Sequence, residues 1–213
     1  MPRNARALAL QAVKTTAAVA DRVHPPRRGV VVLIYHRVEA GSGLQVDLPA
    51  GLFDEQMHFL AERRRACTLS DALVALARDE PAGRDPVVVT FDDGTADFAE
   101  RALPLLERHR VPVTLYVATD FVERQRPFPN GGTPLSWAAL SDAVTTGLVS
   151  VGSHTDTHAV VDGLSSTALE QELDRSTRLI EDRLQTAAHD FAYPKGVAGA
   201  SGADAAVRRR FRS

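Results

Sequence analysis

The chain of 213 residues carries 25 basic and 27 acidic side chains, so it lacks the net positive charge that attracts nucleic acid or an anionic membrane. Hydrophobic residues make up 44% of the chain, which is enough for the core of one domain, and no run approaches the roughly twenty apolar residues that cross a bilayer. Cys67 is the only cysteine, which excludes an intrachain disulfide.

The first residues predict an amphipathic helix rather than a cleavable signal peptide. Early positive charge and many alanines fill residues 3–23, but polar residues interrupt the apolar core that a signal peptide needs. These residues are Gln11, Lys14 and Asp21. We expect a helical extension over residues 1–28 and one domain over residues 29–213.

Strands and helices are expected to alternate along that domain. Short β-branched runs bounded by Gly or Pro predict strands at 30–36, 86–91, 111–118, 148–152 and 189–193. Apolar residues at helical spacing predict helices near 53–61, 69–77, 96–109, 136–146, 166–185 and 203–212. Residues 40–51 and 121–134 are rich in Gly or Pro and predict loops. This alternation is typical of an α/β fold with parallel strands, with fewer strands than the eight of a complete (β/α) barrel.

Four of the expected strands end on polar residues. The carboxyl ends of parallel strands meet at one edge of a sheet, where ligands bind in such folds. The residues concerned are His36, Asp92 with Asp93, His154 with His158, and the stretch from Tyr193 to Lys195 and Gly196. We therefore expect these groups to converge on one functional site.

The pair His154 and His158 indicates a metal site. On one turn of helix or a tight loop, imidazoles four residues apart can face one point. Thr155 stands where the pattern His-Glu-x-x-His of zincins has its glutamate, so a general base must come from elsewhere. The adjacent Asp92 and Asp93 can divide that work, one ligating the metal and the other acting as the base. A carboxylate and two imidazoles suit a divalent ion, most simply Zn²⁺.

Two motifs resemble those of the polysaccharide deacetylases of carbohydrate esterase family four, also called the NodB-homology domain. Residues 90–94 (Thr-Phe-Asp-Asp-Gly) are similar to the first motif of that family, and residues 153–158 (Ser-His-Thr-Asp-Thr-His) to the second. The resemblance extends over about residues 30–196. It implies a distorted (β/α)₇ barrel and the metal-dependent hydrolysis of N-acetyl groups on an amino-sugar polymer such as poly-N-acetylglucosamine, a chitin-like polymer or peptidoglycan.

The resemblance also implies roles for single residues. Carried over to this chain, Asp92 is the general base, and Asp93, His154 and His158 are the metal ligands. Members of the family often act outside the cytoplasmic membrane, although this chain shows no clear signal peptide, so its location is left open.

The chain departs from the family at two motifs. The third motif is usually Arg-x-Pro-Tyr-Gly, but residues 192–196 read Ala-Tyr-Pro-Lys-Gly, so the arginine that orients the base is missing. The late motifs that supply a protonating histidine have no counterpart before Ser213. We therefore expect a barrel that is incomplete at its C-terminus and a sequence that is truncated.

Both departures are explained if the chain is similar to the branch that deacetylates poly-β-1,6-N-acetylglucosamine, in which the motif order is permuted. Residues 35–38 (Tyr-His-Arg-Val) resemble the first strand of that branch. His36 is then the candidate general acid, and Lys195 and Tyr193 are candidates for contact with the substrate or its oxyanion. Two other functions stay open, namely a non-catalytic carbohydrate-binding protein and an amidase of the same fold that acts on a small non-sugar amide.

Overall fold

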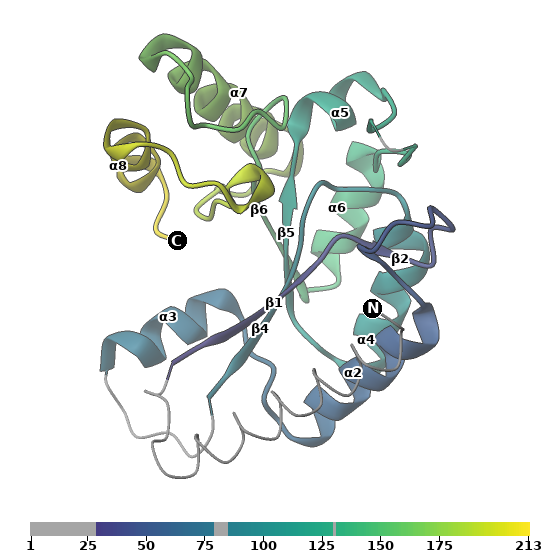
Figure 1. Ribbon diagram of the computed structural model, residues 1–213. Helices are drawn as coiled ribbons and strands as arrows, with labels where there is room; N and C mark the ends of the chain where they lie inside the picture. Colours follow the sequence, from purple (N-terminus) through teal and green to yellow (C-terminus); the bar gives the residue numbers. More distant parts are fainter. Residues whose placement is uncertain (1–28, 79–84, 130) are drawn as a thin grey trace, which may run out of the picture.

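The β-branched runs of the sequence form the strands of one parallel sheet. The computed structural model describes residues 29–78, 85–129 and 131–213, so the helical extension expected over residues 1–28 lies outside the described residues. The strands follow the order β1-β4-β5-β6 (Figure 1). They are β1 (Val31–Tyr35), β4 (Val87–Phe91), β5 (Val113–Val117) and β6 (Val149–Ser153). The expected α/β fold with parallel strands is confirmed.

The register of this sheet aligns the end of β1 with that of β4, and the end of β5 with that of β6. Tyr35 pairs with Phe91, the last residues of β1 and β4, and Phe91 pairs with Leu115 of β5. Val117 at the end of β5 pairs with Ser153 at the end of β6. The residues that follow β1, β4 and β6 therefore emerge at the same edge of the sheet, as parallel strands require.

One face of the sheet is covered by helices that bury the main core. Figure 1 shows α2, α4 and α6 along this side. Phe53 of α2, Leu106 of α4 and Leu140 of α6 are fully buried in the same cluster as Val89 and Leu115 of the sheet. The helix bounds are α2 (Ala50–Glu62), α4 (Leu103–His109), which continues a π-helical turn η1 (Phe98–Ala102), and α6 (Trp137–Thr145).

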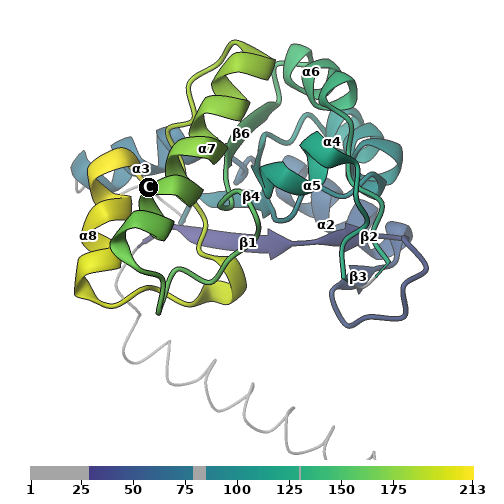
Figure 2. The same cartoon turned by 90° about the horizontal axis from the view of Figure 1, so that it is seen from above.

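A second, smaller core lies between α7 (Ser166–Leu184) and α8 (Ser201–Arg210). Leu169 and Leu173 of α7 pack there with Phe191, Val207 and Phe211. Figure 2 shows α7 beside both β6 and α8. Because α7 belongs to this cluster and also contacts β6, it is well placed to support the loop that joins β6 to α7.

Other elements complete the described part of the chain. They are β2 (Arg37–Val38) and β3 (Asp47–Leu48), which pair in parallel, α3 (Leu69–Arg78), α5 (Thr119–Arg124) and the 3₁₀ turn η2 (Pro194–Gly196). None of the helices in the described part of the chain is both long enough and apolar enough to cross a membrane.

Three sequence expectations about this fold were wrong. The loop expected at residues 40–51 contains β3 and the first two residues of α2. The strand expected at residues 189–193 is reduced to a single bridge between Phe191 and Ser153. The ladder stops there because the carbonyl of Ala192 faces Nδ1 of His154, and the N–H of Thr155 donates to Oγ of Ser153. The loop expected at residues 121–134 begins inside α5, since the Pro and Gly residues that favour a loop start only at Pro127.

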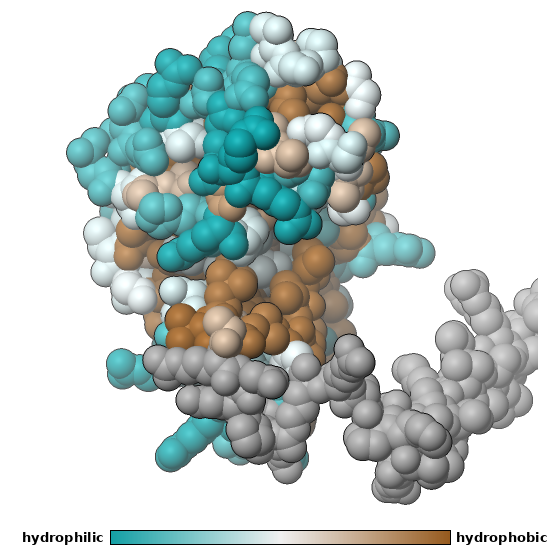
Figure 3. Space-filling view, turned by 90° about the vertical axis from the view of Figure 1, so that its left-hand side faces the viewer, coloured by the Kyte–Doolittle hydropathy of each residue, from teal (hydrophilic) through white to brown (hydrophobic). Residues whose placement is uncertain are grey.

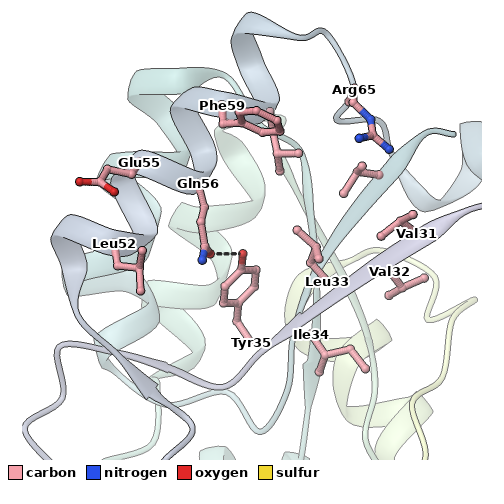
Figure 4. Close-up of a pocket in the computed structure, with 12 residues that line it drawn as sticks. Val31, Val32, Leu33, Ile34, Tyr35, Leu52, Glu55, Gln56, Phe59 and Arg65 are labelled. Atoms are coloured by element: carbon pink, nitrogen blue, oxygen red, sulfur yellow. Dashed lines mark hydrogen bonds between the residues drawn. The ribbon is translucent and has the colours of Figure 1, made fainter. Parts of the chain in front are cut away.

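The strand β1 lies at the edge of the sheet and borders an apolar groove. The groove encloses about 870 Å³ between β1 and α2, where Leu52 and Phe59 face the strand (Figure 4). The hydroxyl of Tyr35 donates to Oε1 of Gln56 across it, at 2.6 Å. Ile34 is 62% exposed, and Figure 3 shows apolar surface gathered over the lower half of one face of the molecule.

The start of α7 offers a test of this fold. Oγ of Ser165 accepts a hydrogen bond from the backbone N–H of Ala168 at 3.2 Å and so caps the helix. We expect Ser165→Ala to lower the free energy of unfolding by about 1 kcal/mol, because that N–H loses its partner. Urea denaturation measures the change, with the exposed neighbour Ser166→Ala as the control. Equal stability of the two variants would show that the cap contributes nothing.

Candidate metal centre and active site

Asp93, His154 and His158 bring their ligand atoms together at the carboxyl edge of the sheet. Nε2 of His158 lies 3.3 Å from Oδ1 of Asp93, and Nε2 of His154 lies 3.7 Å from the same oxygen. The ligand atoms of the three residues all lie within 4.8 Å of one another. Three potential ligand atoms this close together could hold one metal ion.

The turn after β4 places Asp93. The N–H of Asp92 still donates to the carbonyl of Tyr35, so the ladder between β4 and β1 continues to Asp92. Asp93 then takes a left-handed backbone conformation with φ of 73°, which Asp tolerates better than most residues. Gly94 follows with φ of 90°, and a Cβ there would lie 3.3 Å from Val117. The sequence Asp-Asp-Gly therefore suits both the turn and its close contact with β5.

His154 is fixed from two sides. Its backbone N–H donates to the carbonyl of Val117, and its Nδ1 lies 2.9 Å from the carbonyl oxygen of Ala192. A carbonyl can only accept, so Nδ1 carries the hydrogen and the lone pair of Nε2 is directed at Asp93. An imidazole whose other nitrogen donates to a carbonyl is the usual arrangement of a metal-binding histidine.

The charges of these groups fit a divalent cation. Burial, followed by the neighbouring His158, lowers the pKa of His154 to about 4, so its imidazole is neutral at pH 7. Burial pushes the pKa of Asp93 upward, but a hydrogen bond from His158 and the charges of the nearby histidines outweigh it and hold this pKa below its usual value. An ionised carboxylate and a neutral imidazole are the forms that bind Zn²⁺.

Asp92 lies outside this ligand cluster and faces His36. Nε2 of His36 is 3.9 Å from Oδ2 of Asp92, and the Asp92 side chain is only 13% exposed. Burial and then the charge of Asp93 raise the pKa of Asp92 to about 7. A carboxyl group with a pKa near neutrality is suited to take a proton during catalysis at that pH.

The third motif, residues 192–196, lines a cavity beside Asp92. Asp92 and His36 border about 550 Å³ of space together with Tyr193 and Lys195. The hydroxyl of Tyr193 donates to Oδ1 of Asp204 in α8 at 2.7 Å, so this bond ties the motif to α8. Lys195 is exposed and has φ of 59° within η2. Every candidate site residue therefore lies at one edge of the sheet. Each belongs either to the cluster of three potential ligands or to the lining of this cavity.

Sequence reasoning missed other residues that line the cavity. Tyr116 of β5 and Leu69 of α3 border it beside Asp92. Both lie inside regular elements, where an aromatic or apolar residue is indistinguishable from an ordinary core residue. Successive side chains of a strand point to opposite faces of the sheet. Only this rule, applied to Tyr116 between the core residues Leu115 and Val117, could have placed Tyr116 on the cavity side.

Comparison with known proteins identifies the family. Residues 79–210, more than half of the chain, match the sequence profile of the family described as polysaccharide deacetylase. The chain belongs to the polysaccharide deacetylase family. A curated relative is YxkH of Bacillus subtilis strain 168, named as a candidate polysaccharide deacetylase, which is 24% identical over 166 residues. The match covers 78% of this chain but 56% of YxkH, so the chain spans little more than half the length of that relative.

Solved structures of other proteins share the fold. IcaB from Ammonifex degensii is 26% identical with a TM-score of 0.73, and the match covers 86% of this chain and 81% of that one. The deacetylase PplD of Streptococcus pyogenes, solved with acetate, is 21% identical with a TM-score of 0.73, covering 85% of this chain and 79% of that one. These structures confirm the expected distorted-barrel fold class.

Proposed function

We propose that this polysaccharide deacetylase homologue hydrolyses the N-acetyl groups of an amino-sugar polymer at the edge of its sheet, with a divalent ion, most simply Zn²⁺, held by Asp93, His154 and His158. One observation carries the proposal: the cluster of three ligands lies next to Asp92, a carboxyl group whose pKa is raised toward neutrality. A metal site beside a separate proton acceptor is what amide hydrolysis requires.

The residues of this chain then have distinct tasks. A divalent ion, when bound, supplies positive charge that polarises an amide carbonyl and lowers the pKa of a water molecule. Asp92 takes the proton of the attacking water. His36, which directly follows the neighbouring strand β1, gives a proton to the nitrogen that leaves. The backbone N–H of Lys195 is our candidate donor to the oxyanion. The C–N bond breaks, and the products are acetate and a free amine.

Within this class we propose poly-β-1,6-N-acetylglucosamine as the substrate. The support is the position of His36, which comes from the first strand and lies 3.9 Å from Asp92. A general acid from that strand makes a later histidine unnecessary, as in the permuted branch that the motif at residues 35–38 resembles.

Acetate release tests the function and the substrate together. The purified chain with Zn²⁺ is incubated with β-1,6-linked and with β-1,4-linked N-acetylglucosamine oligomers, and with a small aromatic acetamide. Faster acetate release from the β-1,6-linked oligomer supports the proposal. Release from the small amide alone, without inhibition by the sugars, would favour an amidase, and binding of sugar without release would favour a carbohydrate-binding protein.

The role of His36 has its own test. We expect His36→Ala to lower kcat by about 10²–10³-fold, because the leaving nitrogen loses its proton donor. Zinc content should not change, since His36 is not one of the three residues that form the ligand cluster. His58→Ala is the control, because His58 lies on α2 beside Glu62 and away from the site. Substantial activity in His36→Ala would eliminate it as the acid.

A further inference from the structure

The two histidines of the candidate metal centre are held in place differently. His154 directly follows β6, is 1% exposed, and is fixed by the carbonyl groups of Val117 and Ala192. His158 lies four residues further along the loop between β6 and α7, and its side chain is 27% exposed. The position of His158 therefore depends on the conformation of this loop.

That loop has a conformation that needs support. Thr155 has φ of 62° and His158 has φ of 61°, both in the left-handed region that L-residues avoid. Such residues persist where surrounding contacts hold them. The contacts that hold this loop are therefore part of what places His158.

Glu172 of α7 supplies these contacts just before His158. Its Oε2 accepts from the backbone N–H groups of Asp156, at 3.0 Å, and Thr157, at 2.8 Å. Its Oε1 accepts from the hydroxyl of Thr157 at 2.7 Å. Glu172 therefore holds two consecutive residues of the loop, Asp156 and Thr157, although it is not one of the three clustered ligands.

Other contacts hold the earlier part of the loop. Oγ of Ser176 lies 2.8 Å from Oγ of Ser153, and both residues are fully buried. Arg175 forms an ion pair with the side chain of Asp156 at 2.9 Å. Within this set, Glu172 is the residue that binds the backbone next to His158, which makes its effect on that ligand the most direct.

We propose that Glu172 is a positioning residue of the metal centre, which holds the loop so that His158 faces the same point as Asp93 and His154. This inference rests on the proposed metal site. It assigns to α7 a part in metal affinity, although Glu172 is not itself one of the three clustered ligands.

Zinc affinity tests this role without any substrate. The metal-free chain is titrated with Zn²⁺ in competition with a chromophoric chelator. We expect Glu172→Ala to weaken zinc binding by about 10–100-fold, the usual effect of losing an outer-shell partner of a metal ligand. Glu172→Gln should stay within about 3-fold, because its amide oxygen can still accept from both backbone N–H groups. Glu181→Ala, which removes an exposed carboxylate from the same helix, is the control.

A double-mutant comparison separates positioning from general destabilisation. If Glu172 acts through His158, Glu172→Ala has no further effect on zinc affinity in a His158→Ala chain. An equal further loss in that background, or wild-type affinity in Glu172→Ala, would overturn this inference and leave the proposed function standing. Failure of the unaltered chain to bind Zn²⁺ would overturn both.

Discussion

Replacing Asp92 with Asn is expected to lower acetate release by about 10²–10⁴-fold, since an amide cannot take the proton of the attacking water. Asn has nearly the same shape, and Asp92 lies outside the ligand cluster of Asp93, His154 and His158, so the variant should keep its zinc. Acetate production measures the first effect, and elemental analysis of the dialysed protein measures the second.

The neighbouring residue supplies the matched control for this experiment. Asp93→Asn should lose zinc as well as activity, because it removes the charged ligand while Asn tolerates the left-handed backbone at this position. If instead Asp92→Asn loses zinc and Asp93→Asn keeps it, the roles of the two aspartates are exchanged.

Removing the buried His154, which we propose as a ligand, should have a comparably large effect. We expect His154→Ala to weaken zinc binding by at least about 10²-fold, since loss of a ligand costs no less than loss of its outer-shell partner. In the unaltered chain, a chelator should abolish acetate release and added Zn²⁺ should restore it. Release from His154→Ala should not return at the zinc concentration that restores the unaltered chain.

The control for His154→Ala is His189→Ala, because His189 is exposed and is not part of the ligand cluster. Circular dichroism shows whether His154→Ala remains folded, which matters because its imidazole is almost fully buried. A folded His154→Ala chain that binds zinc as tightly as the unaltered chain would contradict the assignment of this histidine as a ligand.

The sequence predicted those parts of the fold that depend on local pattern. β4 and β5 are buried at every position. The β-branched run at residues 86–91 predicted a strand covered on both faces, and residues 111–118 predicted the next strand. The strand expected near Phe191 failed for a different reason, because the carbonyl of Ala192 faces the ring of His154, 38 residues earlier, and not a backbone N–H of β6. A long-range partner of this kind leaves no periodic signal in the sequence.

The same distinction holds for the candidate site. The approach of Asp93 to His154 follows from the rule that parallel strands end at one edge, so the motifs were enough to predict it. Glu172 could not be predicted, because a glutamate on a charged helix is ordinary until the helix is packed against a particular loop. Its relation to Asp156 and Thr157 depends on how α7 packs beside β6.

The order of strands in the sheet also bears on how the centre assembles. Asp93 follows β4 and His154 follows β6, and β5 lies between these strands in the sheet, so the ligands meet only after both strand pairings have formed. Closing a loop of about sixty residues costs chain entropy before any ligand contact repays it. If zinc binds at this proposed centre, we therefore expect it to slow unfolding of the completed sheet more than it speeds folding.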